Sequence, residues 1–123
     1  FNEEERKKEI RNSDIVISML PARFHKEVAK DCVHFGKSLV TASYISKELK
    51  ELNDEVVRKG LVFMNEIGLD PGVDHMSAMQ IINGIKEKGG KMILFESFTG
   101  GLVAPQSDTN LWHYKFTWNP RNV

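Results

Sequence analysis

Residues 15–42, IVISMLPARFHKEVAKDCVHFGKSLVTA, hold two short apolar runs separated by a helical pattern. The first run, 15–20, has apolar residues on both faces, which is typical of a parallel strand covered by helices on both sides. The apolar residues that follow recur at helical spacing up to Gly36, so we expect an amphipathic helix over 22–35. The second run, 38–42, predicts another buried strand. A strand, a helix and a strand in this order favour a right-handed crossover in an α/β fold.

The alternation continues on both sides of this stretch. On the amino-terminal side, Asn2 is a typical cap for a charged helix that reaches about Asn12. On the carboxyl-terminal side, we expect a helix that begins after Ser46 and ends at Gly60, followed by a third strand over 61–65.

Beyond the third strand, the pattern predicts a helix over 73–88, a fourth strand over 91–98 and a possible strand over 114–118. Strands and helices that alternate in this way indicate a mainly parallel sheet. The fourth strand alternates more than the others, so we place a domain junction between about residues 70 and 90.

Composition excludes several classes of protein. The 123 residues carry 17 Lys and Arg against 17 Asp and Glu, so a nucleic acid is not an expected partner. No apolar run approaches the roughly 18 residues of a membrane span. Cys32 is the single cysteine, which rules out an intrachain disulfide and favours a reducing compartment, the cytoplasm. The four His show no metal-ligand spacing, so no metal site is expected.

Ligands of open parallel sheets bind beyond the carboxyl ends of the strands. That rule selects three segments, 20–22, 42–44 and 66–72. The middle one offers the hydroxyls of Ser43 and Tyr44, and the last contains Asp70 before a Pro-Gly turn. The plainer alternative is that the hydroxyls end a strand and the carboxylate belongs to an ordinary turn.

Four motifs carry a resemblance to a known family. They are VTASYI at 40–45, MNEIGLDPGVDH at 64–75, GGLVAP at 100–105 and YKFTW at 114–118. In this order they resemble the saccharopine dehydrogenases of the NADP-dependent, L-glutamate-forming type, also called saccharopine reductases. The resemblance implies an internal fragment of a longer polypeptide, because the glycine-rich turn of that family lies upstream of these motifs and is not found in this chain.

The resemblance implies a fold and a division of the chain. The fold is α/β, the C-terminal half of a Rossmann-like, mainly parallel doubly wound sheet that runs into the start of an α+β catalytic domain. Residues 1–72 would be the later part of the dinucleotide-binding domain, and residues 73–123 the incomplete start of the catalytic domain.

The resemblance also implies binding residues. Those expected to line the nicotinamide cofactor are Leu20, Ala42, Ser43, Leu69, Asp70, Pro71 and Asn119. Those expected to touch the amino-acid substrate are Ser43, Tyr44 and Asp70. Asp70 would act in catalysis by stabilising a protonated imine or a secondary ammonium. Two residues depart from the family pattern, because Thr99 stands where Cys is usual and Asn119 where Ser is usual.

The implied reaction joins 2-aminoadipate semialdehyde and L-glutamate through an imine, which NADPH reduces to saccharopine, or runs in reverse. NADP(H) is the expected cofactor, with NAD as the alternative, and the small-molecule amino acid is the expected partner. Two other functions stay open: a related imine-reducing dehydrogenase of the carboxynorspermidine type, and a non-catalytic dimerising α/β module. We expect the 123 residues to be inactive by themselves and to form a homo-oligomer, most simply a dimer, because a sheet cut at its middle leaves an open edge.

Overall fold

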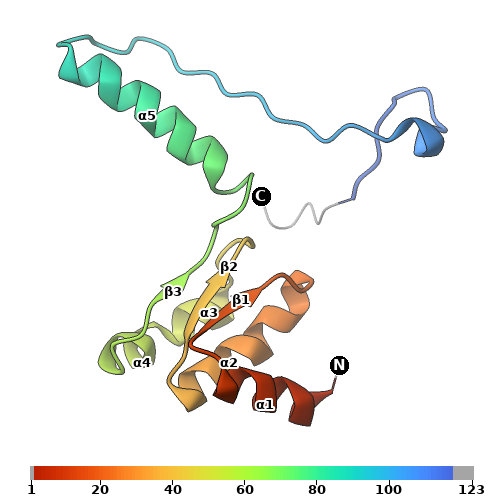
Figure 1. The fold of residues 1–123 in the computed structure, drawn as a ribbon. Helices are drawn as coiled ribbons and strands as arrows, with labels where there is room; N and C mark the ends of the chain where they lie inside the picture. The colour runs from red at the N-terminus through yellow and green to blue at the C-terminus, as the bar shows by residue number, and fades with distance from the viewer. Residues whose placement is uncertain (1, 118–123) are drawn as a thin grey trace. The chain divides into compact units, whose positions relative to one another are not determined.

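A computed structural model describes residues 2–117 of the chain (Figure 1). It divides into two compact units, Phe1–Asn83 and Gly84–Val123. The first unit contains a sheet of three strands, and the second consists mostly of irregular chain. The expected boundary after residue 72 stays a prediction.

The sheet is parallel throughout, as expected for the α/β fold. Its strands are β1 (Ile15–Ser18), β2 (Ser38–Thr41) and β3 (Phe63–Met64), in the spatial order β1-β2-β3. In register, Ser18 is paired with Thr41, and Leu39 is paired with Phe63. The carboxyl ends of β1 and β2 therefore lie side by side.

The helices lie where the sequence patterns predicted them, with two differences. Their bounds are α1 (Glu3–Asn12), α2 (His25–Phe35), α3 (Lys47–Glu51), α4 (Asn53–Arg58) and α5 (Val73–Glu87), with 3-10 turns at Ala22–Phe24 and Pro105–Ser107. The first difference is that a 3-10 turn precedes α2, so this α-helix begins only at His25. The second is a break at Leu52, whose amide bonds to the Leu49 carbonyl three residues back and separates α3 from α4.

The helix ends show the capping that their residues predict. The Asn2 side chain accepts hydrogen bonds from the amides of Glu4 and Glu5 at the start of α1. The Ser46 side chain accepts from the Leu49 amide at the start of α3. Gly36 follows α2 with a φ of 66°, a left-handed conformation that glycine adopts at little cost.

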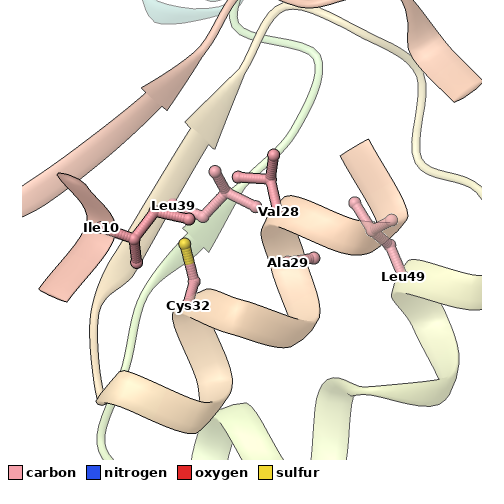
Figure 2. Close-up of a cluster of buried hydrophobic side chains, with 6 residues drawn as sticks. All are labelled: Ile10, Val28, Ala29, Cys32, Leu39 and Leu49. Atoms are coloured by element: carbon pink, nitrogen blue, oxygen red, sulfur yellow. The ribbon is translucent and has the colours of Figure 1, made fainter. Parts of the chain in front are cut away.

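The core lies between the sheet and the first three helices. Figure 2 shows Ile10 of α1 and Leu49 of α3 meeting the α2 residues Val28, Ala29 and Cys32 over Leu39 of β2. Cys32 is fully buried, which confirms that it is a core residue. Hydrophobic burial of this cluster holds the strands in place against α2.

On the opposite face of the sheet, strand side chains are exposed among the described residues of the first unit. Ile15 and Ile17 are 52% and 67% exposed, and Met64 is 47% exposed. Within the first unit, the helices that pack on the sheet therefore cover one face, and the helices expected on the other face stay a prediction. The strands follow one another in a single direction, and right-handed crossovers then place every connecting helix on the same face.

The two strands expected near the carboxyl terminus are absent from the described residues. Residues 91–98 and 114–117 form no strand, and residue 118 lies outside the described residues. A strand needs a neighbouring backbone with which to exchange hydrogen bonds. Alternation of apolar and polar residues within one segment does not show that such a neighbouring backbone is present.

Candidate functional site

The candidate site lies at the carboxyl ends of the three strands, all within the first compact unit. Ser18 and Thr41 end β1 and β2, and both side chains are buried on the core face. The segments that follow, at Leu20 and at Ala42–Tyr44, are more exposed. The strand ends thus combine a buried polar layer with an accessible rim.

A histidine links the two strand ends. The imidazole of His25, 4% exposed, lies with Nδ1 2.8 Å from Ser18 Oγ. Its Nε2 lies 2.8 Å from Ser43 Oγ and 3.2 Å from Thr41 Oγ1. Burial lowers the pKa of His25 below its ordinary value of 6.5, so the ring is neutral at neutral pH. One neutral ring therefore organises three hydroxyl groups.

Local sequence explains why His25 reaches this place. The 3-10 turn over Ala22–Phe24 carries the chain from β1 into α2, and His25 is the first residue of that helix. One turn later, Val28 is buried against the core, which fixes the face that α2 presents to the sheet. His25 is on that same face, at the end of the helix near the strand ends.

The segment 66–72 packs directly on the end of β2. The amide of Glu66 donates to the Ser43 carbonyl (3.0 Å), and the amide of Ile67 donates to the Thr41 carbonyl (3.2 Å). The Glu66 carboxylate in turn accepts from the Ile45 amide at 3.2 Å. These bonds hold the third segment against the middle one.

The turn within 66–72 is tightly folded. The amide of Gly68 donates to the Pro71 carbonyl, and the amide of Val73 donates to the Gly68 carbonyl, each at 2.9 Å. Gly72 has a φ of 145°, and a Cβ atom there would lie 2.2 Å from the Gly68 carbonyl oxygen. The turn can therefore close only around glycine at position 72.

Negative charge gathers around Tyr44. Desolvation raises the pKa of the Tyr44 hydroxyl, and the charges of Asp70, Asp74 and Glu66 raise it further. Tyr44 therefore stays protonated and can donate a hydrogen bond. The same carboxylates act on His75, whose pKa is raised chiefly by its hydrogen bond to Asp74.

Among the cofactor residues implied by the resemblance, Leu20, Ala42 and Leu69 are exposed, and Ser43 is half-buried in the His25 network. Pro71 is buried inside its turn, with a cis peptide bond before it. Asn119 lies outside the described residues.

Among the implied substrate residues, Tyr44 and Asp70 come from loops after different strands, and the Asp70 charge acts on the Tyr44 hydroxyl. Both residues are exposed, and Ser43 directly precedes Tyr44.

Sequence reasoning missed His25 and the role of Glu66. The spacing of the four His bears only on metal binding and gives no sign of this hydrogen-bond network. Among the described residues, no group of three His, Cys, Asp or Glu could hold a metal ion. Its position at the start of the helix that follows a parallel strand was the available signal, since such helix starts lie at the ligand-binding edge.

Two hollows border the motifs. One, of about 290 Å³, is bordered by Leu49 of α3, by Phe63 of β3 and by Asn65. The amide oxygen of Asn65 is the one buried side-chain oxygen in the described residues without a hydrogen-bond partner. The other hollow, of about 330 Å³, lies within the second unit and is bordered by Leu102, Val103, Tyr114 and Thr117. Residues of the motifs at 100–105 and 114–117 therefore border the same hollow.

Comparison with known proteins agrees with this arrangement. Residues 1–64 match the family model described as the saccharopine dehydrogenase NADP binding domain. Residues 68–123 match the saccharopine dehydrogenase C-terminal domain. The chain belongs to the saccharopine dehydrogenase family. The Rossmann-like class expected for the sheet is confirmed by the same match.

Individual relatives are similar over most of the chain. The NADP(+), L-glutamate-forming enzyme of Saccharomyces cerevisiae is 45% identical over 116 residues, 94% of this chain and 26% of the yeast protein. An alpha-aminoadipic semialdehyde synthase of Arabidopsis thaliana is 47% identical over 107 residues, 87% of this chain and 10% of the plant protein. The chain thus spans about a quarter of the length of the yeast relative and a tenth of the length of the plant relative.

A solved structure of the yeast saccharopine dehydrogenase (L-Glu forming), in its apo, histidine-tagged form, has a TM-score of 0.80 to this chain at 42% identity. The likeness covers 98% of this chain and 27% of the yeast chain. In the part of the chain that the structure describes, no helix has the length and apolar character to cross a membrane.

Proposed function

We propose that this chain is part of an NADP-dependent, L-glutamate-forming saccharopine dehydrogenase, an oxidoreductase acting on the CH–NH group of saccharopine in lysine metabolism. The observation that carries the proposal is the packing of segment 66–72 on the end of β2, where the Glu66 amide donates to the Ser43 carbonyl at 3.0 Å and the Ile67 amide donates to the Thr41 carbonyl at 3.2 Å. These hydrogen bonds bring loops that follow different strands together, which supports a single ligand site at the sheet edge.

The rim residues suit a nicotinamide cofactor. Leu20 and Ala42 offer exposed apolar surface for a flat ring, and the adjacent Ser43 offers a hydroxyl for its carboxamide. When bound, NADPH would donate a hydride to the imine, or NADP⁺ would accept one from saccharopine, and the chain supplies orientation. The chain has no glycine-rich turn to hold a pyrophosphate, so we assign that contact to another part of the longer protein.

The acidic loop suits an amine substrate. The Asp70 carboxylate is exposed, and Glu66 and Asp74 add negative charge around it. Such a cluster attracts the secondary ammonium of saccharopine and stabilises the positive charge of the protonated imine. The protonated Tyr44 hydroxyl supplies a donor for a substrate carboxylate.

The test is saccharopine-dependent reduction of NADP⁺ by the full-length protein that carries this chain. Asp70→Asn should lower kcat/KM at least about tenfold, because the loop loses the charge that faces the substrate nitrogen. The matched control is Asp54→Asn, which removes one carboxylate charge in the same way at an exposed position of α4. Its kcat/KM should stay within roughly twofold of that of the unmodified protein. Equal loss in both variants would exclude a substrate role for Asp70.

The same assay separates the two enzymatic functions. A related enzyme of the carboxynorspermidine type would reduce NADP⁺ with carboxynorspermidine and not with saccharopine. Failure with both substrates would favour a non-catalytic module.

We also propose that the chain forms a homodimer through the uncovered sheet face. Ile15, Ile17 and Met64 present an apolar surface there, and burying it against a second copy removes it from water. Light scattering should show a dimer that Ile17→Lys converts to a monomer. A monomer before substitution would contradict the proposal.

We assign the protein to the cytoplasm, since a single buried thiol suits a reducing compartment. A fluorescent fusion of the full-length protein tests this. A mitochondrial signal would instead match the mouse relative, whose name is alpha-aminoadipic semialdehyde synthase, mitochondrial.

A further inference from the structure

Three hydroxyl groups surround one buried imidazole at the edge of the sheet. Ser18 lies against Nδ1 of His25, and Thr41 and Ser43 lie against Nε2, all within 3.2 Å. Ser18 and Thr41 are 4% and 1% exposed, so neither can reach a ligand. Ser43 is half-buried and belongs to the exposed rim. It is the member of the network that connects the imidazole with the rim.

The imidazole decides what kind of hydrogen bond Ser43 offers. In a neutral ring, one nitrogen donates and the other accepts. If Nε2 accepts the Ser43 proton, the Ser43 oxygen presents lone pairs to a ligand. If Nε2 donates, the Ser43 hydroxyl keeps its proton for a ligand acceptor. Either way, the direction of the Ser43 hydroxyl is set by His25.

The backbone holds Ser43 in place for this contact. Its amide donates to Thr41 Oγ1 at 3.3 Å, and its carbonyl accepts from the Glu66 amide at 3.0 Å. The main chain is therefore fixed on both sides, and the orientation of the side chain is left to His25. Orientation of a contacting group is a property that affects binding and rate more than folding.

We propose that His25 is a positioning residue for the saccharopine dehydrogenase reaction: its Nε2 fixes the Ser43 hydroxyl toward the bound cofactor and substrate. The inference rests on the proposed function and adds a residue to its site. His25 touches neither ligand and acts through Ser43.

Two substitutions separate the two sides of the ring. The side-chain amide of Gln reaches about as far as Nε2, and that of Asn about as far as Nδ1. In the full-length protein, His25→Gln should keep the contact with Ser43, and His25→Asn should lose it. We expect kcat/KM for saccharopine to fall about tenfold in His25→Asn, the loss of one hydrogen bond, and no more than about threefold in His25→Gln.

A double-mutant cycle tests whether the effect passes through Ser43. If it does, His25→Asn should change kcat/KM little in a Ser43→Ala background. The thermal midpoint is measured in parallel, with Val28→Ala as a control that destabilises the same helix and leaves KM unchanged.

Each outcome has one meaning. If the unmodified protein is active, the positioning role is overturned when His25→Asn and His25→Gln have equal kcat/KM. It is also overturned when the effects of His25→Asn and Ser43→Ala on kcat/KM are additive. An unmodified protein that does not oxidise saccharopine overturns the proposed function, and the role of His25 in that reaction falls with it.

Discussion

Nε2 of His25 lies 2.8 Å from the Ser43 hydroxyl, although the two residues are 18 positions apart in the chain. One begins α2 and the other follows β2, so the contact exists only because α2 packs across the strand ends. The same ring reaches Ser18, the last residue of β1. A single buried side chain thus links the carboxyl ends of β1 and β2.

The His25 ring makes the chain sensitive to acid. Its pKa in the folded state is below 6.5 because of burial, so the unfolded chain binds its proton more readily. The neutral His25 ring therefore contributes fully to the free energy of unfolding above pH 6.5, and this contribution is lost as the pH falls through the folded pKa. Over that range the free energy of unfolding falls by up to about 1.4 kcal/mol per pH unit. Urea unfolding from pH 7 to pH 5 should show this fall, and His25→Gln should flatten it. An identical pH dependence in both chains would contradict the prediction.

Gly72 is expected to be indispensable for the turn after β3. Alanine would place a Cβ 2.2 Å from the Gly68 carbonyl oxygen at a φ of 145°, so Gly72→Ala should cost at least about 2 kcal/mol. Gly84→Ala is the matched control, because Gly84 lies inside α5 with open space around it and alanine favours a helix by about 1 kcal/mol. Thermal unfolding should move in opposite directions for the two variants.

The ion pair between Arg6 and Asp31 joins α1 to α2. Arg6 Nε lies 2.6 Å from Asp31 Oδ2, and both side chains are about nine-tenths buried, with 12% and 11% exposure. Asp31→Asn removes the charge that faces the guanidinium and should lower the free energy of unfolding by about 1.5–3 kcal/mol. Glu27→Gln breaks an exposed pair with Lys30 and should change it by less than about 0.5 kcal/mol. Equal effects in urea titrations would show that burial of the first pair is unimportant.

Cys32 should resist alkylation. Burial, with a smaller effect of the Asp31 charge, raises the pKa of its thiol to about 12. The reactive thiolate is therefore scarce at pH 8, and we expect iodoacetamide to label the folded chain at least about 100-fold more slowly than the chain in urea. Mass spectrometry over time measures both rates. Rapid labelling of the folded chain would mean that the core around α2 opens.

The chain should bind NADPH weakly when it is not part of the longer protein. It contains no glycine-rich turn for the pyrophosphate, and the residues of its rim contact only a nicotinamide ring under the proposed function. A fluorescence titration should show no saturation below about 1 mM, a concentration that corresponds to weak binding. Tight, saturable binding would require a pyrophosphate site elsewhere in these residues.

The local sequence pattern predicted the helices, because the backbone hydrogen bonds of a helix lie within the helix itself. The helix over α2 was expected from its apolar spacing and from Gly36, and the observed helix ends there. Residues 91–98 have a clear strand pattern but form no strand among the described residues, because a strand requires hydrogen bonds from a second segment. The pattern of a strand likewise does not specify which segments cover its two faces, and in the first unit the described helices cover one of them.

The amino-acid sequence by itself determined the parallel α/β class, the buried Cys32 and, through motifs such as VTASYI at 40–45, the family. Periodicity and local motifs carry this information because they depend on residues close together in the chain. Only the tertiary structure decided that His25 meets Ser18, Thr41 and Ser43, and that all described helices against the sheet cover one face. Those contacts join distant segments, and their geometry is set by packing of α2 on the strands, which no local pattern encodes.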